Sequence, residues 1–202
     1  MYSSASVRYI PNALTVFRIL LTPLVLVLCT IPTLAAQGTA VVVFMCASAS
    51  DYYDGVLARR MGARSRLGQF LDPLADKILV LSVFGMLAVE EPHIVPWWAV
   101  LLIAGRDVLV TALRSWAEAH GRTLRTFRIA KGKTLLQLAF LFGMLVLRAA
   151  AHLPPPISDG ARWLLYETAV PYVLLVFVVG FTVVTGLLYL LASEEETVRS
   201  DP

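Results

Sequence analysis

The sequence predicts an all-α integral membrane protein with six transmembrane helices. Apolar residues make up 58% of the 202 residues and charged residues only 15%, whereas soluble domains carry roughly 25% charged residues. Six long apolar runs are each near the roughly 20 residues that a helix needs to cross a bilayer. They span residues 12–31, 35–57, 67–89, 96–117, 130–151 and 166–192. Strands of a membrane barrel would alternate apolar and polar residues, which these continuous runs do not.

Prolines mark the expected ends of several of these helices, because proline is disfavoured in helix interiors. Pro11 is expected to open the first helix and Pro32 to close it. Pro92 and Pro96 flank the third connection, and prolines 154–156 follow the fifth helix.

Basic residues gather at one end of the predicted helices, which favours a cytoplasmic location for that end. They are Arg8, Arg18, Arg59, Arg60, Arg64, Arg66, Arg114, Arg122, Arg125, Arg128, Lys131 and Lys133. Only Arg148 and Arg162 lie at the other end. We therefore expect both termini to be cytoplasmic, with one six-helix membrane domain at 1–192 and an acidic cytoplasmic tail at 193–202.

Four aspartates form the candidate active site. Asp51 and Asp54 lie near the end of the second predicted helix, and Asp72 and Asp76 lie in the third, so each pair shares one helix face. The segment Gly55–Gly68, rich in glycine and arginine, is expected to form a tight turn that brings the pairs together. Carboxylates so close need a counter-charge, and oxygen ligands without His or Cys favour Mg²⁺ or Mn²⁺.

Two other interpretations of the aspartates remain open at this point. They could pair with the neighbouring arginines, although this leaves Asp72 and Asp76 unexplained inside an apolar run. They could also line the ion pathway of a divalent-cation transporter, although transporter sites usually lie near the bilayer midplane.

The spacing of these residues resembles the signature of the CDP-alcohol phosphotransferase family, DxxDGxxARx8GxxxDxxxD. The matching residues are Asp51, Asp54, Gly55, Ala58, Arg59, Gly68, Asp72 and Asp76. Members of that family are six-helix membrane enzymes that displace CMP from a CDP-linked substrate with an alcohol. The resemblance implies that all four aspartates ligate metal and that Asp76 is also the general base. Asp51, Asp54, Asp72 and the residues Gly55, Ala58, Arg59 and Gly68 would bind the CDP group.

A second set of polar residues is expected to bind a phosphate on the acceptor alcohol, because fixed cations offset the desolvation of a dianion. The set consists of Arg18, Arg106, Arg114, Lys131, Lys133 and Thr134. Topology signalling and contact with anionic lipid headgroups are the competing explanation for basic residues here. Asn12, Thr15 and Arg18 are three residues apart and form a polar stripe along the first predicted helix. Hydrogen bonding between helices by Asn12 and Thr15 accounts for this stripe as well as a role of Arg18 in phosphate binding does.

Several longer stretches are similar to a bacterial branch of the family that uses sn-glycerol 3-phosphate as acceptor. They include PNALTVFRILLTP, GRDVLVTALRSWAEAHG and KGKTLLQ. Asp107 and Ala130 depart from that branch, which commonly has Glu and Gly there. The resemblance implies CDP-diacylglycerol, glycerol 3-phosphate and membrane lipid as partners, a homodimer, and a bacterial cytoplasmic membrane location with the active site facing the cytoplasm. Inositol phosphate, serine or a lipid alcohol are alternative acceptors. We expect no nucleic-acid partner.

Overall fold

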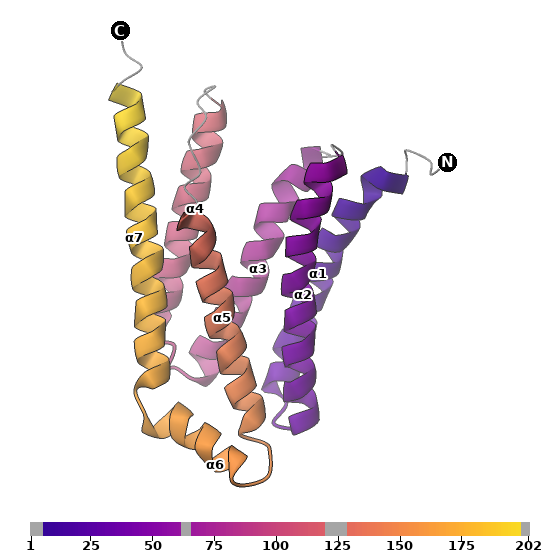
Figure 1. Ribbon diagram of the computed structural model, residues 1–202, viewed down its shortest axis with the longest axis vertical. Helices are drawn as coiled ribbons and strands as arrows, with labels where there is room; N and C mark the ends of the chain where they lie inside the picture. The colour runs from indigo at the N-terminus through magenta and orange to yellow at the C-terminus, as the bar shows by residue number, and fades with distance from the viewer. Residues whose placement is uncertain (1–5, 62–65, 120–128, 199–202) are drawn as a thin grey trace. The chain divides into compact units, whose positions relative to one another are not determined.

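The chain is all helical in the computed structural model, as the sequence predicts (Figure 1). The structure describes the backbone of residues 6–61, 66–119 and 129–198, and the side chains of residues 17–50, 77–113, 117 and 132–189. Within these ranges the elements are α1 (Ser6–Thr30), α2 (Leu34–Met61), α3 (Arg66–Glu90), α4 (Trp97–Ala119), α5 (Ile129–Ala150), α6 (Ile157–Arg162), the π-helical turn η1 (Trp163–Glu167) and α7 (Val170–Val198).

Each of the six apolar runs coincides with one long helix apart from a few residues at its ends. The expected helix bounds near Pro11 and Gly55 are wrong. Helix α1 begins at Ser6, upstream of Pro11, so this proline does not open the helix. Helix α2 continues to Met61 and α3 begins at Arg66. The helices therefore take up residues 55–61 and 66–68 of the expected turn, because leucine, alanine and arginine favour the helix and outweigh single glycines. Residues 62–65 lie outside the described part.

The last connection contains structure that the sequence pattern does not predict. A short helix, α6, and the turn η1 follow the three prolines, and Thr168 then adopts an extended conformation (φ −119°, ψ 154°). Helix α7 accordingly begins at Val170 instead of residue 166, and it continues past residue 192 to Val198. Pro171 falls in its first turn, where no intrahelical N–H donor is needed.

Two helices of the described part are long and apolar enough to cross a membrane. They contain the spans Gly132–Ala150 and Val170–Tyr189, and only 39% of each span is buried. Large apolar side chains such as Val173 and Phe177 are exposed on α7, which suits contact with lipid and not with water. Membrane crossing by the other helices and the cytoplasmic location of both termini stay predictions.

The chain divides into two compact units, and each is described by itself. The first comprises Met1–Met86 with Leu141–Thr168, and the second comprises Leu87–Phe140 with Ala169–Pro202. In the first unit α1 packs along α2, and Cys29 of α1 and Ala40 and Phe44 of α2 are buried. In the second unit α4 packs along α7. A single membrane domain over residues 1–192 stays a prediction.

The end of α1 is held by side chains from two other helices. The last carbonyls of a helix lack intrahelical partners, and Gln37 Nε2 of α2 donates to the carbonyls of Cys29 (2.6 Å) and Ile31 (3.2 Å). Arg148 Nη2 of α5 donates to the same Cys29 carbonyl at 3.3 Å. Gln37 is 2% exposed, so water cannot easily replace it. These bonds fix the connection between α1 and α2.

Replacing Gln37 by leucine is expected to lower the free energy of unfolding by about 0.5–1.5 kcal/mol, because two hydrogen bonds are lost while the Cys29 and Ile31 carbonyls keep Arg148 and the Thr33 N–H as donors. Thermal unfolding of the purified protein in detergent would measure this loss. Thr39→Val is the matched control, because Thr39 is exposed and donates only to Ala35 of its own helix. Equal effects of the two substitutions would contradict the role given to Gln37.

Candidate functional site

The four aspartates lie in two helices of the first unit. Asp51 and Asp54 are in α2, and Asp72 and Asp76 are in α3. The backbone is helical through both pairs, which keeps each pair on one helix face. Their side chains lie outside the described set, as do those of Gly55, Ala58, Arg59 and Gly68. Among the side chains that are described, no three His, Cys, Asp or Glu residues gather as a metal site would require.

Arg18 lies inside the first unit, against α2. It is only 1% exposed, and its Nε donates to the carbonyl of Ala47 at 3.2 Å. Ala47 precedes Asp51 by four residues, so the arginine contacts α2 about one helical turn from the first aspartate. The expected partners of Arg18 in the acceptor set, Arg106 and Lys133, belong to the second unit.

Three charged side chains meet in the second unit, and we call them the Arg106–Asp107–Lys133 cluster. Asp107 Oδ1 accepts from Arg106 Nη1 at 3.2 Å and from Lys133 Nζ of α5. The exposed fractions of the three side chains are 9%, 8% and 11%. Two cations and one carboxylate give the cluster a formal charge of +1. Buried charges require such partners.

Threonines of α7 and a glutamine of α5 extend the cluster across three helices. Arg106 Nε donates to the Thr182 carbonyl at 3.2 Å, and its Nη2 lies 3.5 Å from Thr185 Oγ1. Gln137 Nε2 donates to Thr182 Oγ1 at 3.2 Å. Each threonine hydroxyl also donates to a carbonyl of its own helix, at 2.8 and 2.9 Å. The network therefore joins α4, α5 and α7 through buried polar groups.

Arg106 and Lys133, two members of the predicted acceptor set, both donate to one carboxylate, that of Asp107. Thr134 lies next to Lys133 on α5 and is half-buried, but its position is rotated about 100° around the helix. The side chains of Arg114 and Lys131 lie outside the described set. Asp107, Gln137 and the two threonines were not expected as site residues. Their signal in the sequence is polar residues inside apolar helices.

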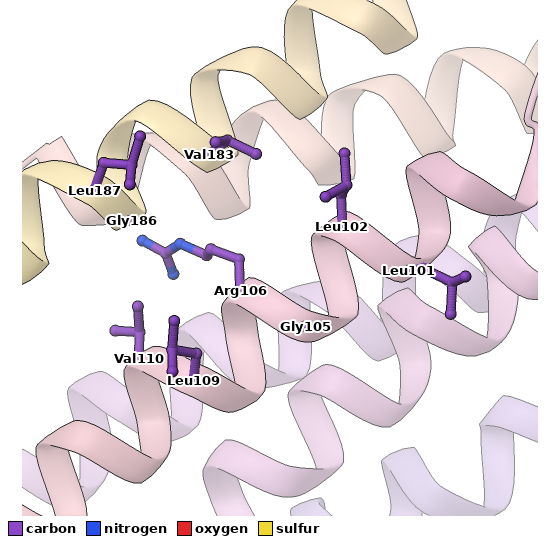
Figure 2. A pocket seen from close by; sticks show the side chains of 9 residues that line it. All are labelled: Leu101, Leu102, Gly105, Arg106, Leu109, Val110, Val183, Gly186 and Leu187. Atoms are coloured by element: carbon purple, nitrogen blue, oxygen red, sulfur yellow. The ribbon is translucent and has the colours of Figure 1, made fainter.

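A cavity of about 250 Å³ lies beside Arg106 between α4 and α7 (Figure 2). Apart from the arginine and two glycines, leucine and valine side chains line it. Leu101 and Leu187 on its rim are 67% and 54% exposed, so the cavity opens outward. An aliphatic lining of this kind suits an alkyl group better than a polar alcohol.

Gly186 of α7 leaves the space in which Arg106 lies. In Figure 2 the arginine side chain extends from α4 toward this glycine. A Cβ atom at residue 186 would lie 2.8 Å from Arg106 Cγ and 3.1 Å from its Nε. These separations are shorter than van der Waals contact, so any larger residue would displace the arginine or the helix.

Comparison with known proteins gives a family match over most of the chain. The family model described as CDP-alcohol phosphatidyltransferase matches residues 8–184. Proteins named CDP-diacylglycerol–glycerol-3-phosphate 3-phosphatidyltransferase from Yersinia pestis and Escherichia coli K12 are each 36% identical over 141 residues. The protein of that name from Salmonella choleraesuis is 37% identical over 141 residues. Each alignment covers 67% of this chain and 76% of the relative.

Removing one member of the Arg106–Asp107–Lys133 cluster is expected to be more harmful than removing a pair. Lys133→Met removes one cation from a buried carboxylate, which should destabilise the protein by about 1–3 kcal/mol. Adding Asp107→Leu removes that carboxylate and should restore part of the loss. A double-mutant cycle on unfolding in detergent measures the coupling. Strictly additive effects would contradict a shared carboxylate.

Proposed function

The chain belongs to the CDP-alcohol phosphatidyltransferase family, and we propose that it transfers the phosphatidyl group of CDP-diacylglycerol to sn-glycerol 3-phosphate. The products are phosphatidylglycerol phosphate and CMP. The observation that carries the proposal is the family match over residues 8–184, which includes all four aspartates. The names of the relatives support the choice of acceptor. The apolar helices and the family membership indicate an integral membrane enzyme.

The aspartates suit a hard divalent ion, Mg²⁺ or Mn²⁺. The structure supports this through the helical backbone that carries each pair, because residues three or four apart present their side chains on one face. A donor set made of carboxylate oxygens matches the preference of these ions. Asp51, Asp54, Asp72 and Asp76 would hold the metal. When bound, it would neutralise negative charge on the pyrophosphate of the donor.

Asp76 is the proposed general base. Its carboxylate would accept the proton of the acceptor 1-hydroxyl while that oxygen forms a bond to the phosphorus of the phosphatidyl group. The bond from this phosphorus to the CMP oxygen breaks, and CMP leaves with the electron pair. Gly55, Ala58, Arg59 and Gly68 would bind the cytidine and phosphates, where small residues allow close approach to the backbone.

Arg106 and Lys133 are the proposed anchors for the phosphate of the acceptor. They are cations in apolar surroundings, and the cluster keeps a formal charge of +1 after Asp107 is counted. A phosphate bound there would gain charge-assisted hydrogen bonds in a medium of low dielectric. From the sequence pattern we also assign Arg114, Lys131, Thr134 and Arg18 to the acceptor phosphate. Arg18 contacts α2 through the Ala47 carbonyl.

The acceptor is tested by incubating membranes that contain the protein with labelled CDP-diacylglycerol and one alcohol at a time. We expect phosphatidylglycerol phosphate and CMP with glycerol 3-phosphate, and little product with serine, inositol phosphate or glycerol. Chelation of divalent ions should abolish turnover, and added Mg²⁺ or Mn²⁺ should restore it. Turnover of another alcohol in preference to glycerol 3-phosphate would overturn the proposed acceptor and leave the family reaction standing.

Asp76→Asn should retain binding of CDP-diacylglycerol but lower kcat by roughly 10²-fold or more, because the amide cannot accept the proton. Equilibrium binding of labelled nucleotide and the initial rate would separate the two effects. Asp159→Asn is the control, since this residue lies in α6 of the last connection. Full activity of Asp76→Asn would end the general-base assignment.

A further inference from the structure

The Arg106–Asp107–Lys133 cluster contains a carboxylate, Asp107, whose negative charge would repel a phosphate. Arg106 of this cluster lies against Gly186, which leaves room for the arginine side chain. We propose that Asp107 and Gly186 are positioning residues for the acceptor phosphate. Asp107 holds the two cations through their charges, and Gly186 supplies the space for Arg106. This proposal rests on the proposed function, because it concerns how that acceptor is held.

Asp107 fixes both cations on a single oxygen atom. Its Oδ1 accepts from Arg106 Nη1 of the same helix and from Lys133 Nζ of the neighbouring helix. Two cations that converge on one point repel each other. Because the Arg106 and Lys133 side chains are only 9% and 11% exposed, water screens this repulsion weakly. The carboxylate removes this repulsion and sets the separation of the two donors. A bound phosphate then meets donors that are already in place.

Gly186 acts on the same arginine from the opposite helix. Arg106 Nε donates to the carbonyl of Thr182, which lies one helical turn before Gly186 on α7. The side chain therefore crosses α7 at the level of this turn, and Gly186 is buried beneath it. Added side-chain atoms at residue 186 would lie 2.8 Å from Arg106 Cγ and 3.5 Å from its Cδ. The arginine could not keep its present path.

A purely structural role for the cluster makes different predictions. If Asp107 only ties α4 to α5, its loss should reduce stability and lower kcat with every substrate, without a selective effect on the acceptor. If only net charge matters, Asp107→Asn raises the formal charge of the cluster from +1 to +2 and should lower the KM for glycerol 3-phosphate. If Asp107 positions the two cations, Asp107→Asn should have the opposite effect and raise the KM for glycerol 3-phosphate.

The first test replaces Gly186 by alanine and changes no charge. We expect the KM for glycerol 3-phosphate to rise roughly tenfold or more, because displacement of a binding group by about 1 Å can have effects of this size. The KM for CDP-diacylglycerol should stay within about twofold. Gly180→Ala on the same helix is the matched control, since an added Cβ there meets nothing within 4 Å. Alanine favours the helix more than glycine does, so both variants are expected to fold.

The second test compares Asp107→Asn with Asp107→Glu. The amide should raise the acceptor KM roughly tenfold or more, and the longer carboxylate should rescue most of the loss, because it keeps the charge that holds the cations. Gln137→Met is the control: it removes a buried hydrogen bond to Thr182 in the same network but leaves the three charges intact. Unfolding of every variant in detergent shows whether the protein is intact.

The outcomes separate this proposal from the proposed function. If the wild-type protein uses glycerol 3-phosphate and neither Gly186→Ala nor Asp107→Asn changes its KM, positioning is overturned and the function stands. If Asp107→Asn fails to fold, Gly186→Ala decides alone. If the wild-type protein prefers another phosphorylated alcohol, the named acceptor is overturned and positioning is judged on that alcohol. Preference for an alcohol without phosphate would overturn both.

Discussion

The ion pairs that Asp107 makes with Arg106 and Lys133 are the interaction on which the second unit depends. Charges surrounded by leucine and valine are tolerated only when they have partners, and here one carboxylate serves two cations from different helices. Because Arg106 also reaches α7 through Thr182, the same pair determines how three helices meet. Apolar side chains alone would allow many rotations of these helices, since dispersion forces lack direction. The polar network selects one of them.

Two chemically different sets of charged residues lie in different units. The first unit contains the four aspartates, and the second contains the Arg106–Asp107–Lys133 cluster. An acidic set suits a metal and the pyrophosphate that it neutralises, whereas a net cationic set suits a free phosphate. In the proposed reaction the first set serves the donor and the second serves the acceptor. This division explains why one chain carries charged residues of both signs inside apolar helices.

Much of the fold could be predicted from the sequence, because long apolar runs without strand alternation indicate where a long helix lies. The run at 67–89 lies in a helix at Arg66–Glu90. The failures lie where local signals compete, as at Pro11 and at the segment after Gly55, where helix formation continues through residues that often end it. The aspartate site was predicted from carboxylates at helical spacing in apolar runs, and it stays a prediction because those side chains lie outside the described set. The partners of Arg106 on α7, Thr182 and Gly186, could not be predicted, because they lie far from it along the chain. Hydrophobic periodicity identifies the buried face of a helix but does not identify which other helix packs against that face.

The path of Arg106 across α7 has a mechanical consequence for the second unit. The guanidinium is bonded at one turn of α7 and its alkyl stem lies against Gly186 in the next. If α7 slid along α4, Arg106 would lose its hydrogen bond to the Thr182 carbonyl, and its alkyl part would meet a residue larger than Gly186. Tilting of α4 and α7 together preserves both contacts, so a joint tilt costs less than sliding of one helix past the other.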